Sequence, residues 1–274
     1  MTALVANARM YAVTGGVAAA WRALFDWVSD CAGVTLETID HAPPSPLHAL
    51  WTREDLGCAF MCGYPWATWT ASPPRPALVA ALAPSPQRYG GRSVYGTDIV
   101  VRADSDIAAV DTLRDRRFAF TTPSSQSGYQ APRALFAAAA LANGGALFAP
   151  AVGPLVTPRA IVDAVVQGTA DAGPLDSYWH DLLRVHEPAT AAKLRTIATT
   201  PMTPMPPLVG AAAVSPALRT RIGDAFLAAG SAHALRETRA ALLIDRFVAP
   251  DADRYAILVA KARETDALGY RRLQ

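Results

Sequence analysis

Residues 121–136 read "TTPSSQSGYQAPRALF", which places several small hydrogen-bonding side chains and a glycine directly before an apolar, alanine-rich helical run. The preceding stretch "RFAFT" (117–121) has the composition of a buried strand. Strand, polar loop and helix in this order form the basic unit of an α/β fold. The first turn of a helix leaves backbone N–H groups unpaired at the positive end of the helix dipole, so this loop predicts a site for an anion or a polarised oxygen.

The same order of elements repeats along the chain. Apolar residues recur at helical spacing over residues 17–31, where Thr14 is the expected N-cap and Gly33 the expected end of a helix. Cys31 is expected on the apolar face of that helix. Short apolar runs typical of strands are "TALVA" (2–6), "GCAFMCG" (57–63), "PALVAALA" (76–83), "DIVVR" (98–102), "RFAFT" (117–121), "ADAGPL" (170–175) and "LRTIAT" (194–199). The chain is therefore predicted to be an α/β protein with sheets covered by helices.

Three further helices are predicted from one start signal, a hydroxyl residue followed by proline. The segments are "SPLHALW" from Ser45, "TPRAIVDAVVQG" from Thr157 and "SPALRTRIGDAFLAAG" from Ser215. The hydroxyl residue is the expected N-cap and the proline takes the first helical position. Gly168 and Gly230 are expected to end the second and third of these helices.

Two proline- and glycine-rich stretches, residues 83–101 and 199–214, interrupt this rhythm. A chain of 274 residues is long enough for two lobes of ordinary size. If the chain crosses between lobes at both stretches, residues 1–97 and 205–274 form lobe I and residues 98–204 form an inserted lobe II. A ligand cleft is then expected between the two lobes.

Composition excludes several classes of function. Lys and Arg number 25 against 23 Asp and Glu, and the basic residues are scattered, so a nucleic-acid partner is not expected. No stretch approaches the roughly 20 strongly apolar residues of a membrane span. The first 25 residues lack the pattern of a secretory signal peptide. We therefore expect a periplasmic protein if a signal peptide has been removed, and a cytoplasmic one otherwise.

The cysteines and histidines do not form a recognisable metal or catalytic pattern. Cys58 and Cys62 would lie about 13 Å apart on one face of a strand, too far for a disulfide, and together with Cys31 they are interpreted as core thiols. No histidine keeps metal-ligand spacing with them, so no metal and no cofactor are expected. His180 and His186 lie within or just after one helix and are expected to face solvent. No catalytic residues are predicted, because no nucleophile, base and orienting group stand in a recognisable arrangement.

Five motifs in order resemble the phosphonate/phosphate-type family of ABC-transporter solute-binding proteins. They are "RMY" (9–11), "CGYP" (62–65), "YGTDIVVR" (95–102), "SSQSGYQAPRAL" (124–135) and "GTADAGPLDSYWHDLL" (168–183). The resemblance spans most of residues 4–210. It implies a two-lobed type 2 periplasmic-binding-protein fold, with a mixed sheet flanked by helices in each lobe, two hinge crossings and closure around a small solute.

In that family the segment matching Ser125, Gln126, Ser127 and Gly128 holds the phosphonate or phosphate oxygens. Gly128 would let the backbone approach the ligand, since a Cβ there would obstruct it. The alternative is that Ser125 or Ser127 only caps the helix. This chain has Gln126 where many phosphonate binders have threonine.

The resemblance also places Tyr11, Tyr64 and Tyr95 near the ligand, each at or near a strand end, although tyrosines also fill lobe interfaces. Trp66 and Trp69 are interpreted as packing residues of the core or of a lobe surface, with Trp66 the better candidate for the cleft. Asp176 can cap the helix that follows it, bind a ligand amine or hydroxyl, or do both. For Thr157 a cap alone is the simpler interpretation.

The sequence thus predicts a monomeric solute-binding protein for a small polar, anionic ligand, phosphonate-like or phosphate-like, which it presents to an ABC permease. Two alternatives remain open: an enzyme on the same fold, similar to those of thiamine-pyrimidine synthesis, and a stand-alone ligand sensor.

Overall fold

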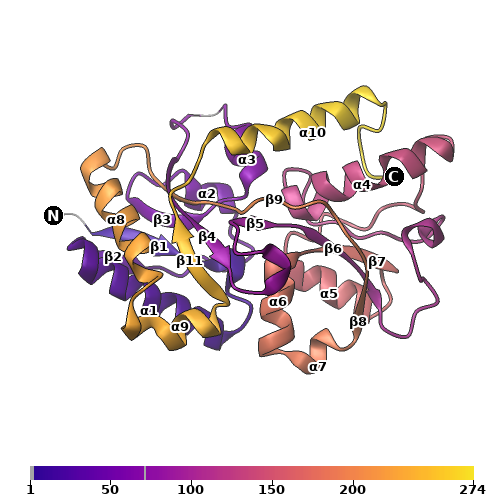
Figure 1. Ribbon diagram of the computed structural model, residues 1–274. Helices are drawn as coiled ribbons and strands as arrows, with labels where there is room; N and C mark the ends of the chain where they lie inside the picture. Colours follow the sequence, from indigo (N-terminus) through magenta and orange to yellow (C-terminus); the bar gives the residue numbers. More distant parts are fainter. Residues whose placement is uncertain (1–2, 71) are drawn as a thin grey trace. The chain divides into compact units, whose positions relative to one another are not determined.

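The computed structural model describes residues 3–70 and 72–274, and the chain separates into two compact units. Unit 1 contains residues 1–94 and 204–254, and unit 2 contains residues 95–203 and 255–274. Each unit combines helices with its own sheet (Figure 1). Thr2, the first residue of the predicted strand "TALVA", lies outside the described residues.

Unit 1 is built on a mixed sheet with the strand order β11-β4-β10-β3-β1-β2. Strand β1 runs parallel to β2 and β3, whereas β10 runs antiparallel to β3 and β4, and β11 antiparallel to β4. Its strands are β1 (Leu4–Asn7), β2 (Leu36–Thr38), β3 (Leu56–Phe60), β4 (Ala77–Pro84), β10 (Leu208–Gly210) and β11 (Ile244–Val248). Its helices are α1 (Gly15–Ala32), α2 (Leu47–Trp51), α3 (Gly63–Ala67), α8 (Pro216–Ala229) and α9 (Arg236–Ala241), with short 3-10 turns at Arg9–Tyr11, Gln87–Tyr89 and His233–Leu235. A further 3-10 turn, Asp253–Tyr255, spans the end of unit 1 and the first residue of the return to unit 2.

Helix α1 shows how local sequence determines these elements. The Thr14 side chain accepts a hydrogen bond from the Val17 N–H, and Gly33 adopts a left-handed conformation with φ of 58°, so both predicted ends are confirmed. The apolar face of α1 is buried, and α1 packs against α8. Cys31 is exposed, so its assignment to the core was wrong, whereas Cys58 and Cys62 are buried.

Helix α2 begins later than its sequence signal indicated. Pro46 has an extended ψ of 136° and is itself the N-cap, without a side-chain cap hydrogen bond. The helix therefore starts at Leu47, and Ser45 lies one residue too early to cap it. In contrast, the Ser215 side chain caps α8 by accepting from the Leu218 N–H.

Unit 2 is built on the antiparallel strand order β7-β6-β8. Its strands are β6 (Thr97–Arg102), β7 (Ala172–Asp176) and β8 (Leu194–Thr199). Its helices are the π-helix η4 (Gln126–Gln130), α4 (Ala131–Ala142), α5 (Pro158–Val166), α6 (Ser177–His186), α7 (Pro188–Ala191) and α10 (Ala256–Ala267), with a 3-10 turn η3 at Val110–Leu113. The predicted strand "RFAFT" is reduced to isolated parallel bridges, from Phe118 to Ala172 and from Ala119 to Val152. A further two-stranded sheet pairs β5 (Val94–Tyr95) with β9 (Thr203–Pro204).

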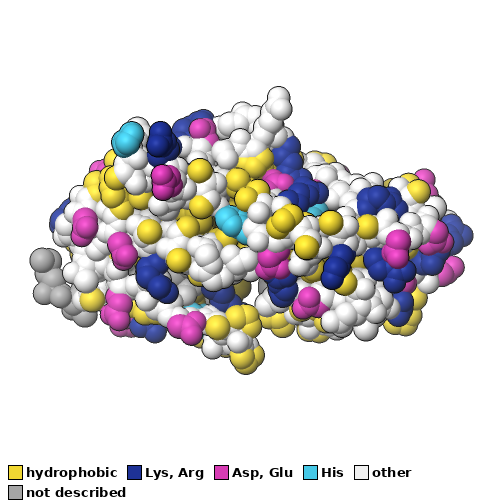
Figure 2. Space-filling view, turned by 90° about the horizontal axis from the view of Figure 1, so that it is seen from below, with side chains coloured by type: hydrophobic (Ala, Val, Ile, Leu, Met, Phe, Trp, Pro, Cys, Tyr) yellow, Lys and Arg dark blue, Asp and Glu magenta, His cyan; other side chains and the backbone are white. Residues whose placement is uncertain are grey.

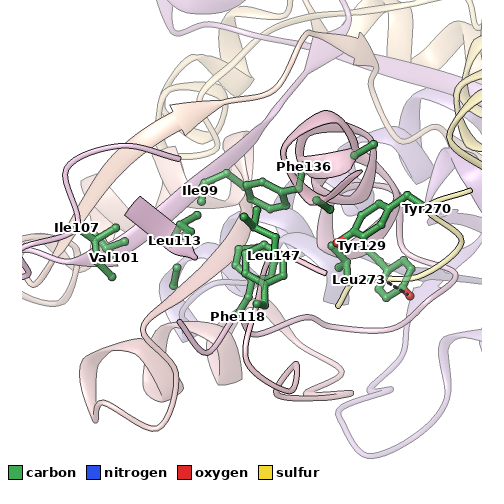
Figure 3. Packing of buried hydrophobic residues seen from close by; sticks show 14 residues of the cluster. Ile99, Val101, Ile107, Leu113, Phe118, Tyr129, Phe136, Leu147, Tyr270 and Leu273 are labelled. Carbon is green, nitrogen blue, oxygen red and sulfur yellow. Dashed lines mark hydrogen bonds between the residues drawn. The ribbon is translucent and has the colours of Figure 1, made fainter. Parts of the chain in front are cut away.

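The C-terminal residues 255–274 belong to unit 2, although the sequence analysis assigned 205–274 to lobe I. The reason is apolar packing: Tyr270 and Leu273 are buried in the same cluster as Tyr129, Phe136 and Leu147 (Figure 3). The chain therefore enters unit 2 a second time at residue 255, a crossing that has no proline- or glycine-rich signal in the sequence.

Candidate functional site

The loop that opens helix α4 has the geometry of a capped, widened helix start. The Ser125 Oγ accepts a hydrogen bond from the Gly128 N–H at 2.9 Å, and the Gln130 N–H donates to the Ser125 carbonyl at 3.0 Å, which gives the π-helical turn η4. Gln126 is buried and Ser127 is half-buried. Ser125 is thus the N-cap of this turn. The turn itself is of interest because π-helical turns are frequent at functional sites.

Residue 128 has no room for a side chain, because Thr121 of the same unit lies against it. A Cβ on residue 128 would lie 1.8 Å from the Thr121 Oγ1. The Thr121 N–H also donates to the Gly128 carbonyl at 3.3 Å. The absence of a side chain at Gly128 therefore admits the Thr121 hydroxyl, a cause that the sequence interpretation did not foresee. Thr121 is 6% exposed, and its hydroxyl has no hydrogen-bond partner within the described residues.

Asp176 lies at the end of β7 and caps helix α6. Its Oδ1 accepts from the N–H groups of Tyr178 at 2.9 Å and Trp179 at 3.1 Å. The residue is 7% exposed. The capping role weighed for Asp176 is confirmed, and a negative charge there is stabilised by the positive end of the α6 dipole.

Thr157 caps the third helix start, that of α5. Its Oγ1 accepts from the Ala160 N–H at 3.1 Å, and Pro158 takes the first helical position as expected. The helix ends at Val166, and Gly168 follows with a φ of 73°.

Two threonines connect these three helix starts. The Thr97 Oγ1 donates to the Ser127 carbonyl at 3.2 Å, and Thr97 pairs with Asp176 in the β6–β7 register. The carbonyl of Thr121 accepts from the Val156 N–H at 3.1 Å, directly before Thr157. We call the set Ser125–Gly128, Thr97, Thr121, Thr157 and Asp176 the helix-start cluster. It brings three helix starts to one end of the unit 2 sheet, and at the start of α6 the Asp176 carboxylate already accepts from two of the N–H groups.

The predicted tyrosines are not gathered with this cluster in one unit. Tyr11 and Tyr64 belong to unit 1, and only Tyr95, which is buried in β5, belongs to unit 2. Tyr11 is 1% exposed and packs edge-on against Phe60, with ring centroids 4.8 Å apart. Tyr64 is half-buried near the start of α3.

Trp66, the further candidate, is also in unit 1. It is 4% exposed, its Nε1 donates to the Pro76 carbonyl at 2.9 Å, and the Arg75 guanidinium lies 4.2 Å from its ring centroid. These contacts within unit 1 are those of a packing residue.

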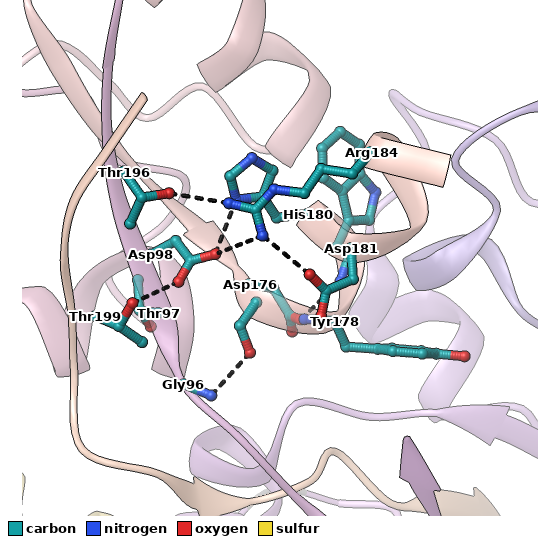
Figure 4. Close-up of polar contacts among 12 residues, drawn as sticks. Gly96, Thr97, Asp98, Asp176, Tyr178, His180, Asp181, Arg184, Thr196 and Thr199 are labelled. Carbon is teal, nitrogen blue, oxygen red and sulfur yellow. Dashed lines mark hydrogen bonds and ion pairs between the residues drawn. The ribbon is translucent and has the colours of Figure 1, made fainter. Parts of the chain in front are cut away.

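A buried polar network beside the cluster was missed by sequence reasoning. His180 is 1% exposed, so the expectation that it faces solvent was wrong, and its Nδ1 lies 2.8 Å from the Oδ2 of the fully buried Asp98 (Figure 4). The Thr199 hydroxyl donates to the other Asp98 oxygen at 2.7 Å. His180 is buried because α6 packs with this side against β6, where the Asp98 carboxylate needs a partner. The adjacent pair Thr97 and Asp98 in "YGTDIVVR" was the available signal.

An ion pair joins the start of α5 to the end of α6. Both terminal nitrogens of Arg159 donate to the Glu187 carboxylate, and the Arg159 guanidinium lies 5.6 Å from the ring centroid of Trp179. The hydrogen bond from Arg159 lowers the pKa of Glu187 below its ordinary value.

On the face shown in Figure 2, basic and acidic side chains are interspersed.

The described residues contain neither a candidate metal cluster nor a candidate membrane span. Across residues 3–70 and 72–274, no group of three or more His, Cys, Asp or Glu side chains could hold a metal ion. Over the same ranges, no helix combines the length and apolar character needed to cross a bilayer.

Several solved structures are similar in fold to this chain over nearly its whole length. The chain is similar to PhnD1 from Prochlorococcus marinus in complex with methylphosphonate, with a TM-score of 0.77, 16% identity, and 96% of this chain and 98% of that chain covered. It is also similar to a binding protein component of an ABC phosphonate transporter from Pseudomonas aeruginosa (TM-score 0.71, 18% identity, 98% of each chain). XAC2383 from Xanthomonas citri, bound to chloride ion, gives a TM-score of 0.66 at 19% identity over 97% of this chain and 99% of that one. The predicted two-lobed α/β fold of periplasmic binding proteins is thereby confirmed.

A match to a family model identifies the protein family. The model for "ABC transporter, phosphonate, periplasmic substrate-binding protein" matches residues 16–255, so the chain belongs to this family. No curated protein sequence matches the chain significantly. The solute-binding role predicted from the five motifs is that of the family, whose members work with a small-molecule ligand and a permease.

Proposed function

We propose that this protein binds a small oxyanion of the phosphonate or phosphate class at the helix-start cluster and delivers it to an ABC permease. The observation that carries the proposal is the meeting of three helix starts at Thr97 and Thr121 in unit 2. Backbone N–H groups and helix dipoles at such positions stabilise anions without a basic side chain. The methylphosphonate in the similar Prochlorococcus structure supports the same ligand class.

Chemically, the cluster supplies neutral donors. Hydroxyl groups come from Ser127 and Thr121, and the Thr121 hydroxyl is a buried group without a protein partner among the described residues. The Thr121 hydroxyl is packed against Gly128, so a ligand oxygen reaches it only if the turn shifts; such a contact would then remove the cost of leaving the hydroxyl unsatisfied, about 1–3 kcal/mol.

Asp176 adds a selective element to the proposal. A carboxylate beside an anion repels it unless the ligand also carries a donor or a cation. We therefore propose that the preferred ligand combines an oxyanion with an amine or hydroxyl. Binding without turnover, a periplasmic location and a monomeric state complete the proposal, in line with the transport family.

The test is isothermal titration of the purified protein with inorganic phosphate, methylphosphonate and 2-aminoethylphosphonate. Saturable binding of at least one of them is expected, and the aminated compound should bind tightest. Mass spectrometry of each mixture after incubation should return the unchanged compound. Chemical conversion would favour the enzyme alternative, and lack of binding to all three would contradict the ligand class.

A further inference from the structure

Arg133 in helix α4 is a buried cation that reaches the C-terminal segment. It is 2% exposed. Its Nη1 donates to the Asp266 carboxylate and to the Tyr270 carbonyl at 2.8 Å, and its Nη2 donates to the Ala262 carbonyl at 3.2 Å. These three contacts hold α10 and the residues after it against α4.

The same guanidinium also holds Gln130, the last residue of the π-helix. The Gln130 Oε1 accepts from Arg133 Nε at 3.2 Å and from Nη2 at 2.9 Å. The Gln130 Nε2 in turn donates to the Pro123 carbonyl at 2.7 Å. Pro123 precedes and Gln130 follows the segment Ser125–Gly128, so one amide side chain joins the two ends of this turn.

A second contact ties the π-helix to the C-terminal residues. The Leu273 N–H donates to the Tyr129 hydroxyl at 3.1 Å, and both residues lie in the unit 2 core (Figure 3). Tyr129, Gln130 and Arg133 all belong to the motif "SSQSGYQAPRAL", and none of them is needed as a ligand contact in the proposed function.

Packing of α10 against α4 does not account for the Gln130 contacts. The bonds from Arg133 to Asp266, Ala262 and Tyr270 suffice to join those two helices. The bond from Gln130 to Pro123 adds nothing to that joint, because its two residues lie at opposite ends of one short turn. Its effect is to fix the backbone of residues 123–130.

We propose that Arg133 and Gln130 are positioning residues that keep Ser125–Gly128 in the geometry that binds the ligand, and that they couple this turn to residues 262–273. The proposal rests on the proposed function, since it assigns the geometry of the same turn. Coupling is reciprocal, so a ligand held at the turn also stabilises the C-terminal contacts.

The decisive variant is Gln130→Met, which removes both arms of the amide without changing charge or size greatly. Gln167→Met is its matched control, because Gln167 is exposed in the same unit and its side chain makes no hydrogen bond to the described part of the chain. Arg133→Met, with exposed Arg114→Met as its control, removes the whole connection. Affinity for methylphosphonate, the melting temperature, and amide hydrogen exchange of the ligand-free proteins are measured for all four variants.

Gln130→Met is expected to weaken methylphosphonate binding at least tenfold and to speed exchange of the Gly128 amide at least tenfold, with a melting temperature close to that of the parent. Arg133→Met should show the same two effects together with a lower melting temperature. In the parent, methylphosphonate should slow exchange of the Leu273 amide. Both controls should behave like the parent.

Parent-like affinity and parent-like exchange at residues 125–128 in Gln130→Met would overturn the proposal, as would an effect confined to the melting temperature. If the parent itself does not bind methylphosphonate, the proposed function fails for that ligand. The exchange rates of the ligand-free variants then decide the positioning role alone.

Discussion

The hydroxyl of Thr121 occupies the space in which a side chain on residue 128 would begin, since a Cβ on Gly128 would lie only 1.8 Å from the Thr121 Oγ1. Contacts closer than about 3 Å force the backbone or the neighbour to move. The Thr121 Cβ and Cγ2 would each lie 2.9 Å from the added atom, so rotation of the threonine does not relieve the conflict.

Gly128→Ala is therefore expected to destabilise the protein by about 1–3 kcal/mol, the usual cost of forcing an extra carbon into a packed site. It should also weaken oxyanion binding, because the turn must shift. Thermal unfolding and titration with methylphosphonate measure the two effects. The double variant Thr121→Gly/Gly128→Ala should recover part of the lost stability; a stable, parent-like Gly128→Ala would refute the packing argument.

Replacement of Ser125 and of Ser127 by alanine should affect stability and ligand affinity differently. Ser125→Ala removes a cap hydrogen bond and should cost about 0.5–2 kcal/mol of stability. Ser127→Ala leaves the carbonyl contact with Thr97 in place, so its stability should stay near that of the parent while methylphosphonate affinity falls about tenfold. Equal affinity in the Ser127 variant and the parent would remove that side chain from the proposed site.

Asp176→Asn tests the charge beside the cluster while keeping the cap, because asparagine caps helices about as well as aspartate. Stability should change little. Affinity for 2-aminoethylphosphonate should fall at least tenfold, whereas affinity for methylphosphonate should hold or rise as a repelling charge is removed. A parallel fall for both compounds would mean that Asp176 does not contact the amine.

The alanine variants of Tyr11 and Tyr64 should differ in how much stability they lose. Tyr11→Ala should cost roughly 3–5 kcal/mol, because it empties a fully buried site against Phe60. Tyr64→Ala, at a half-buried residue, should cost much less. Chemical denaturation measures both, and near-equal stability of the Tyr11 variant and the parent would contradict its packing role.

The Arg159–Glu187 pair should give a small pH dependence of stability. The folded pKa of Glu187 is lowered from the ordinary 4.5, chiefly by the hydrogen bond from Arg159, so the stabilisation is present above that value and is lost as the pH falls through the folded pKa. The pair is partly exposed, so about 0.2–1 kcal/mol is expected. Glu187→Gln should therefore be less stable than the parent at pH 7, and the difference should shrink at acidic pH in denaturation series. A constant difference across that range would exclude the linkage.

Features coded by neighbouring residues were predictable from the sequence. The caps at Thr14, Thr157 and Ser215 depend on the three or four residues that follow each of them, and the structure confirms all three. The α/β class follows from the same local alternation of elements. The strand predicted at "RFAFT" is only partly present, because apolar composition indicates a buried segment and does not by itself indicate a strand. Phe118 is buried but forms only an isolated bridge.

Contacts between distant residues were not predictable. Asp98 and His180 are 82 positions apart, and Arg133 and Asp266 are 133 apart. No local pattern marks such partners, and a histidine on an amphipathic helix reads as exposed unless the opposite carboxylate is known. The roles of Thr97 and Thr121 were missed for the same reason, since both threonines contact the turn at Ser127 and Gly128, which the sequence does not link to them.

The burial of Tyr270 and Leu273 in unit 2 has a consequence for biosynthesis. A ribosome releases residues 95–203 well before it adds Tyr270 and Leu273, so the core of unit 2 is completed only after residues 204–254 of unit 1 have been made. The late arrival makes its last folding step a long-range closure, and such closures slow folding because chain entropy is lost before the contacts form. During synthesis, residues 95–203 therefore leave part of their apolar core open until this closure has taken place.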